Sequence, residues 1–225
     1  MKKIAVIVAG GSGLRMGKNI PKQFLLLNNK PIIFHTISAF IEAFREIKIV
    51  LVLPKNNLEQ GETIAEEFKN TNIQIVIGGE SRFQSVKNGL KTITSADSVI
   101  FVHDGVRCLI TSKLIRECYE QAILKGSAIP AVAATDSIRI TSESGSVVVD
   151  RNHIRIVQTP QTFLSSILLP AFEQQYQESF TDEATVVESQ GTPIYLIDGD
   201  YNNLKITRPI DLLIAQQILE ERANS

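Results

Sequence analysis

The sequence has little cysteine, no surplus of either charge and no long apolar run. Its 225 residues include only two cysteines, Cys108 and Cys118, too few for a disulfide framework or for a zinc site built from four cysteines. The 23 basic and 24 acidic residues nearly cancel, so no bulk field attracts nucleic acid or an anionic membrane. An anionic ligand would therefore need a local cluster of cations.

Signals for export or membrane insertion are missing as well. Lys2 and Lys3 precede a short apolar run, residues 4–9, which ends at Gly10 and Gly11. A signal peptide needs a longer apolar core and a small-residue cleavage site. A membrane span needs about 20 apolar residues. We therefore expect a cytoplasmic protein with reduced cysteines and without membrane contact.

The sequence does contain an alternation of short β-branched runs and helical patterns. The candidate strands are nearly continuous apolar runs, as in strands buried on both faces: 4–8, 47–53, 73–77, 99–103 and 128–133. The candidate helices between them are 31–44, 58–69, 82–94 and 111–125. This order predicts an α/β fold with a Rossmann-like, mostly parallel sheet that carries helices on both faces.

The pattern changes after Pro130. Two short β-type runs, 137–140 and 147–150, flank the turn sequence Ser-Glu-Ser-Gly and predict a protruding β-hairpin. The remaining elements are expected as a strand at 154–158, helices at 164–177 and 182–190, a strand at 194–198 and a helix from Pro209. Without a linker or repeat, the chain is predicted to form a single domain, residues 1–225, with an arm at about 136–150.

A glycine-rich loop follows the first candidate strand, and ligands of open parallel sheets bind at the carboxyl ends of strands. Residues 9–23 read AGGSGLRMGKNIPKQ, which matches neither the dinucleotide fingerprint nor the ATPase P-loop. Its glycines still let the backbone approach a ligand and aim amides at phosphate oxygens. Arg15 and Lys22 add cations beside it. A glycine turn with two solvated surface cations is the alternative interpretation.

Further motifs occur in order along the whole chain, at residues 78–86, 102–107, 149–151, 157–161, 181–184 and 203–207. Together with the glycine loop they resemble the 2-C-methyl-D-erythritol 4-phosphate cytidylyltransferases, nucleotidyltransferases of the non-mevalonate route to isoprenoid precursors. Some positions depart from the family pattern. Gly105, Val106 and Cys108 stand where Ala, Ala and Pro are usual, and Ser137 and Arg139 replace Thr and Lys.

The resemblance implies transfer of a cytidylyl group from CTP to 2-C-methyl-D-erythritol 4-phosphate with release of pyrophosphate. It also implies Mg²⁺ or another divalent cation as cofactor. The attacking phosphate monoester is already largely dianionic at pH 7, so no strong general base is needed. Because one polyanion must approach another, catalysis should rest on cations and on positioning.

Roles are carried over from the family residue by residue. The resemblance makes Arg15 and Lys22 the catalytic candidates. It assigns nucleotide binding to Ala9, Gly10, Gly11, Gly13, Gly79, Ser85, Asp104 and Gly105, with Asp104 also the candidate metal ligand. It assigns the polyol phosphate to Arg107, Ser137, Arg151, Thr159, Thr181 and Lys205. It further implies a homodimer formed through the arm, in which Ser137 and Arg151 help complete the partner's site.

Two other functions stay open. Ribitol-5-phosphate cytidylyltransferases catalyse the same type of reaction, but they typically have a longer spacer than residues 18–20 before Pro-Lys-Gln. A nucleotide-binding domain without turnover would be marked by loss of Arg15, Lys22 or Asp104, and all three are present.

Single residues of these motifs also fit plainer roles. Asp104 alone would suit a turn or a helix N-cap. Thr181 would suit the cap of the helix that follows it. His103 fits a packed, hydrogen-bonded side chain better than a catalyst.

Overall fold

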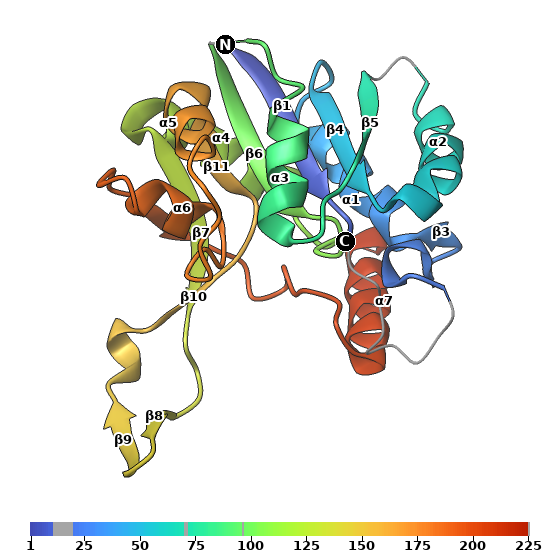
Figure 1. Ribbon diagram of the computed structural model, residues 1–225. Coiled ribbons are helices and arrows are strands. Elements are labelled where there is room, and N and C mark those ends of the chain that lie inside the picture. Colours follow the sequence, from blue (N-terminus) through green and yellow to red (C-terminus); the bar gives the residue numbers. More distant parts are fainter. Residues whose placement is uncertain (11–19, 70–71, 96, 225) are drawn as a thin grey trace.

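The computed structural model describes residues 1–10, 20–69, 72–95 and 97–224, and Figure 1 shows their arrangement. Its strands in the main sheet are β1 (Lys2–Val8), β4 (Lys48–Leu53), β5 (Ile73–Ile77), β6 (Ser98–Asp104), β7 (Ser127–Ala133), β10 (Arg155–Val157), β11 (Gln161–Leu164) and β12 (Leu196–Asp198). Within the described residues these eight strands pair in the order β10-β7-β11-β6-β1-β4-β5, with β12 also on β7. Strands β6, β1, β4 and β5 are mutually parallel, which confirms the predicted mostly parallel sheet.

Helices cover both faces of this sheet because neighbouring residues of each buried strand point to opposite sides. Ala5 and Ile7 of β1 belong to one apolar cluster, while Ile4 and Val6 belong to another. The first cluster includes residues of α1 (Ile32–Ala43), α2 (Leu58–Glu66) and α4 (Ser112–Lys125). The second includes residues of α3 (Arg82–Leu90), α5 (Ser165–Ala171) and α6 (Glu183–Glu188). The near-continuous apolar runs of β1, β4 and β6 are thus explained by burial on both faces, but the expectation was wrong for 73–77, because β5 is an edge strand and only partly buried.

The C-terminal helix α7 (Pro209–Ala223) lies beside the carboxyl ends of the central strands (Figure 1). Ala215 of this helix joins a further apolar cluster with Leu25, Val106 and Ile206. The segment that runs from the 3₁₀ turn η2 (Lys22–Phe24) through the short strands β2 (Leu26–Leu27) and β3 (Lys30–Pro31) packs against the rest of the molecule through this cluster. The cluster therefore anchors the described end of the glycine loop next to the sheet. In the part of the chain that the structure describes, no helix has the length and apolar character of a membrane span.

The main correction to the sequence prediction concerns residues 161–177. A helix was expected over 164–177, but Gln161–Leu164 forms strand β11 and the helix α5 covers only Ser165–Ala171. Strand β11 lies antiparallel between β6 and β7, so these two strands are not neighbours. A four-residue strand is too short to show the alternation of apolar and polar residues by which strands are recognised, and the strands that it pairs with lie far away in the sequence.

Two helices also end earlier than expected. Helix α2 ends at Glu66 instead of residue 69, and α3 ends at Leu90 instead of residue 94. After α3, the Thr92 hydroxyl donates to the Gly89 carbonyl at 2.8 Å and caps the last turn. Side-chain bonds of this kind compete with continuation of a helix, which accounts for the early end.

The predicted arm is present and projects away from the body of the molecule (Figure 1). Strands β8 (Ile138–Ser142) and β9 (Gly145–Val149) form a separate antiparallel pair. Ile140, Val147 and Val148 on this pair are 60%, 63% and 72% exposed. An isolated hairpin is marginal in water, so these apolar side chains need a surface to cover them.

Both cysteines are buried free thiols in the described structure, and burial raises the pKa of each to about 12. Because the thiolate is the reactive form, neither should react with dithionitrobenzoate in the folded protein at pH 8. We expect Cys108 and Cys118 both to react after denaturation in urea. Rapid labelling of either thiol in native buffer would contradict this assignment, and parallel circular dichroism verifies that the labelled sample is folded.

Candidate active site

A pocket of about 240 Å³ opens where the carboxyl ends of β1, β5 and β6 meet, as the motif positions predicted. Strands β1 and β6 run in register, with Val8 opposite Asp104, so the glycine loop and the Asp104 motif begin at the same level. The segment between β5 and α3 closes the third side. The pocket is lined by Val8, Ala9, Gly10, Lys22, Gln23, Gly79, Glu80, Ser81, Arg82, Ser85, Asp104, Val106 and Lys205.

The glycine-loop side of the pocket is held by a buried glutamine. Gln23 is fully buried, and its Nε2 donates to the Ala9 carbonyl at 2.8 Å. Its neighbour Lys22 lines the pocket and donates from Nζ to the Ile206 carbonyl at 3.3 Å. Gln23 therefore fixes the end of β1 relative to Lys22, a role that the sequence motif did not reveal. The candidates Gly11, Gly13 and Arg15 lie outside the described residues.

The loop before α3 forms the wall assigned to the base. Ser81 caps this helix by accepting from the Gln84 amide at 3.1 Å. The Ser85 hydroxyl donates to the Ser81 carbonyl at 2.9 Å and accepts from the Gly79 amide at 3.0 Å. A Cβ on Gly79 would come 2.1 Å from Cγ of Gln84, so this close approach requires glycine. Ser85, expected to read cytosine, thus has its proton engaged within its own loop and can offer a ligand only its remaining lone pair.

Asp104 is the electrostatic centre of the pocket. The residue is 8% exposed, and its Oδ2 lies 2.9 Å from Nζ of Lys205. Its Oδ1 lies 3.3 Å from Nε of Arg82, and Oδ2 lies 3.7 Å from Nε of Arg107. Burial opposes ionisation of this carboxyl, but the charges of Arg82 and Lys205 outweigh burial and hold its pKa well below the usual range. Asp104 is therefore ionised, and its negative charge attracts the three cationic side chains that surround it.

Behind Asp104 stands a buried hydrogen-bonded pair, His103 and Thr159. His103 Nε2 lies 3.1 Å from the Arg107 carbonyl, which can only accept, so this nitrogen carries the proton. Nδ1 then accepts from the Thr159 hydroxyl, whose oxygen in turn accepts from the Asp104 amide at 3.1 Å. Burial lowers the pKa of His103 to about 4, so the ring is neutral at pH 7. His103 is the packed side chain that the sequence favoured, and Thr159 positions Asp104.

Two other candidates lie next to the pocket without lining it. Arg107 Nη1 donates to the Asn203 carbonyl at 2.8 Å, and burial lowers the pKa of this guanidinium. A Cβ on Gly105 would come 2.9 Å from Cβ of Ala9, so Gly105 permits close approach of the segments that follow β1 and β6. Both residues shape the pocket from outside its lining.

The remaining substrate candidates are separated from the pocket. Arg151, in the turn after β9, donates to the Thr135 carbonyl at 2.5 Å, and Ser137 precedes β8. They flank the arm, which projects away from the body of the molecule (Figure 1), and neither lines the pocket of its own chain. Thr181 precedes the capping residue Asp182 of α6, close to Arg82. The described structure thus brings together Ala9, Gly10, Lys22, Gly79, Ser85, Asp104 and Lys205, and leaves the arm residues apart.

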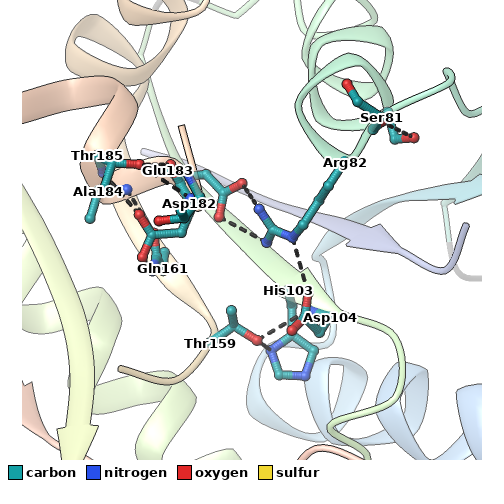
Figure 2. A network of polar contacts seen from close by, with 12 residues as sticks. Ser81, Arg82, His103, Asp104, Thr159, Gln161, Asp182, Glu183, Ala184 and Thr185 are labelled. Carbon is teal, nitrogen blue, oxygen red and sulfur yellow. Dashed lines mark hydrogen bonds and ion pairs between the residues drawn. The ribbon is translucent and has the colours of Figure 1, made fainter. Parts of the chain in front are cut away.

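The sequence assigned no role to Arg82 or Glu183, although both stand in the motifs noted above. Arg82 Nη1 and Nη2 donate to the Glu183 carboxylate at 2.5 and 3.0 Å, while Arg82 Nε points to Asp104 (Figure 2). The sequence signal for this contact was that the two motifs contain residues of opposite charge. Because 101 positions separate them, nothing in the spacing indicated that they meet.

Among the described residues, no group of three or more His, Cys, Asp or Glu side chains could hold a metal ion. The pocket instead presents amides together with Lys22 and Lys205, while Arg82, which also lines it, is held by Glu183 and Asp104. Amides and cationic side chains suit the phosphates of a nucleotide. The predicted local cluster of cations is therefore found. The sheet, its edge loops and this pocket fit an α/β protein that binds a nucleotide.

Comparison with known proteins gives the particular family. The model of the 2-C-methyl-D-erythritol 4-phosphate cytidylyltransferase family matches residues 3–221, and the chain belongs to this family. The enzymes of this name from Bacteroides fragilis and Bacteroides thetaiotaomicron are 41% and 42% identical over 97% of this chain and 100% of theirs. The crystal structure of the Francisella tularensis enzyme has a TM-score of 0.79 at 30% identity, covering 96% of this chain and 99% of that one.

Proposed function

We propose that this protein transfers the cytidylyl group of CTP to 2-C-methyl-D-erythritol 4-phosphate, releasing pyrophosphate, in non-mevalonate isoprenoid precursor biosynthesis. Family membership supports the identity of both substrates. The observation that carries the proposal is a pocket lined by the cations Lys22, Arg82 and Lys205 and by the segments of Ala9, Gly10 and Gly79, together with the acidic residues Glu80 and Asp104. Such a pocket offers charge to a triphosphate and close amides to a small base.

The chemistry needs little proton transfer. An oxygen of the acceptor phosphate attacks the α-phosphorus of CTP, the new P–O bond forms, and the bond to the pyrophosphate oxygen breaks. The acceptor is already largely dianionic, and the neutral, buried His103 is hydrogen-bonded elsewhere. The main barrier is electrostatic, and fixed cations lower it without reorganising during the reaction.

The roles divide between the two ends of the pocket. We assign Lys22 and Arg15 to the triphosphate and to charge at the α-phosphorus. Backbone at Ala9, Gly10, Gly11, Gly13 and Gly79 reads the base, with Ser85 and Gly105 holding these segments in place. Lys205 binds the acceptor phosphate, Thr181 and Arg107 support it, and Thr159 acts through Asp104.

We also propose that Mg²⁺ or another divalent cation takes part. Asp104 is an ionised carboxylate at the pocket, and its hard oxygens suit this ion. Mg²⁺ is usually bound through one or two carboxylates, substrate phosphates and water. Because Oδ2 of Asp104 lies 2.9 Å from Lys205 and Oδ1 lies 3.3 Å from Arg82, an ion held by Asp104 would replace one of these contacts, and the triphosphate and water would supply its other ligands. When bound, the ion would neutralise charge on the triphosphate.

The proposal includes a homodimer in the cytoplasm. The exposed Ile140, Val147 and Val148 of the arm need a covering surface, and Ser137 and Arg151, at the two ends of the arm, do not line their own pocket. A two-fold dimer satisfies both conditions, because each arm can then reach the other protomer's pocket. The balanced charge of the chain gives no reason to propose a nucleic acid as partner.

A pyrophosphate-release assay tests the activity. We expect turnover with CTP and 2-C-methyl-D-erythritol 4-phosphate, little with ATP or GTP, and none in excess EDTA until Mg²⁺ is restored. Ribitol 5-phosphate, tested in parallel, should be the poorer acceptor. Equal rates with ATP, or full activity in EDTA, would contradict the proposed base and metal roles. Faster turnover with ribitol 5-phosphate would favour the related enzyme, and no turnover at all would favour a binding domain.

A further inference from the structure

The ion pair between Arg82 and Glu183 joins the pocket wall before α3 to the start of α6, two segments that lie far apart in the sequence. Arg82 is the first residue of α3, beside the wall assigned to the base, and Glu183 is the first residue of α6, beside Thr181. Glu183 is 1% exposed, and both of its carboxylate oxygens accept from the Arg82 guanidinium. The third nitrogen of Arg82 faces Asp104, so Arg82 stands between two carboxylates (Figure 2).

In this pair, each residue stabilises the charged form of the other. Burial raises the pKa of Glu183, and the adjacent Arg82 opposes this shift. Burial alone would lower the pKa of Arg82, but Glu183 and Asp104 outweigh it and raise that pKa above its usual range. A forked guanidinium held at two nitrogens by one carboxylate has little freedom to turn. Glu183 therefore fixes the direction in which Nε of Arg82 points, which is toward Asp104.

Each helix start is also held by contacts that do not involve the ion pair. Ser81 caps α3, as described above. For α6, Asp182 accepts from the Thr185 amide at 2.9 Å, and Gln161 donates to Asp182 and accepts from the Ala184 amide, both at 2.8 Å. These local bonds shape each turn but do not link α3 to α6. Phe83 and Phe180, with ring centroids 5.6 Å apart, also pack the two segments together, and the ion pair adds the polar contact that connects both turns to Asp104.

We propose that Glu183 is a positioning residue of the active site, acting through Arg82 on Asp104 and thereby on the acceptor-phosphate end of the pocket. The inference rests on the proposed function. Asp104 lies 2.9 Å from Lys205, the cation assigned to the acceptor phosphate. Thr181, which is also assigned to this phosphate, stands two positions before Glu183 in the sequence. The base wall, by contrast, is held by Ser81 and Ser85 and does not need Glu183.

The test is Glu183→Gln, which keeps the shape of the side chain and removes its charge. We expect kcat/KM for the acceptor phosphate to fall about tenfold to a hundredfold, as a small misplacement of reacting groups does, while KM for CTP stays nearly unchanged. Glu188→Gln is the matched control, because Glu188 lies on the same helix but is exposed. Activity of Glu183→Gln within about twofold of that control would overturn the proposal.

A second variant separates positioning from stability. Removing one member of a buried pair is strongly destabilising, whereas replacing both by apolar residues is often neutral. The double variant Arg82→Met with Glu183→Leu should therefore regain much of the wild-type Tm but not the acceptor kcat/KM. Its kcat/KM should equal that of Arg82→Met alone, because Glu183 acts through Arg82. Return of activity together with Tm would show that the pair acts only on stability and would overturn the proposal.

The same experiment separates this inference from the proposed function. Wild-type protein that releases no pyrophosphate would refute the activity directly, whatever the variants do. In that case, amide hydrogen exchange at residues 181–185 still tests whether Glu183 holds this segment in place through Arg82, because the measurement needs no turnover. Exchange should be faster in Glu183→Gln than in Glu188→Gln. Equal exchange in the two variants, each verified as folded by its Tm, would overturn the positional role of Glu183.

Discussion

Lys22→Ala should lower kcat by a factor on the order of 10²–10³ while changing KM for CTP much less. Lys22 lines the pocket, and its Nζ lies 3.3 Å from the Ile206 carbonyl, next to Lys205 in the chain. A fixed cation at this place stabilises charge that develops as the bond to pyrophosphate breaks. Its contribution is larger in the transition state than in the bound complex, so its loss appears in kcat.

Steady-state pyrophosphate release at several CTP concentrations measures both constants. Lys91→Ala, at an exposed position just after α3, is the matched control and should behave as wild type. The Tm of each variant should be recorded, because Lys22→Ala also removes the bond to Ile206. A rise in KM for CTP with unchanged kcat would mean that Lys22 binds substrate and transition state equally, and its catalytic role would be withdrawn.

Mixing Lys22→Ala with Arg151→Ala protein should restore activity that neither variant has alone. Arg151, in the turn after β9 of the arm, does not line its own pocket, whereas Lys22 does. In a mixed two-fold dimer, the core with intact Lys22 would receive the arm with intact Arg151, giving one complete site. Random exchange makes about half the dimers mixed, with one of two sites restored, so recovery should reach about a quarter of wild-type activity.

In the control mixture, a double variant that carries both Lys22→Ala and Arg151→Ala takes the place of the Arg151→Ala protein. No mixed dimer then contains a complete site, and no activity should return. Exchange itself can be measured with two differently tagged proteins. If exchange is complete and the first mixture stays inactive, Arg151 serves its own subunit and the shared site is wrong.

Local sequence determined the central strands and the place of the pocket. Each of β1, β4 and β6 is a near-continuous apolar run, and burial on both faces leaves such a run few other structures, whereas the edge strand β5 is only partly buried. The carboxyl ends of these strands and the loops after them contain Asp104 and the glycines, and parallel strands bring their carboxyl ends to one edge. Because both arguments use neighbouring residues and simple topology, the pocket could be placed from sequence. The hairpin arm was predictable for the same reason, since its turn and flanking strands are adjacent.

Tertiary structure decided what depends on partners distant in sequence. Strand β11 has only four residues, and its place between β6 and β7 comes from pairing with both. Ser85 lines the pocket, and its hydroxyl also closes its own loop through Gly79 and Ser81, contacts that the motif did not show. Arg82 and Glu183 meet across 101 positions because the buried carboxylate of Glu183 needs a partner of opposite sign, which the half-buried Arg82 supplies. Spacing along the chain carries no record of such a pairing, since only the folded sheet brings α3 and α6 together.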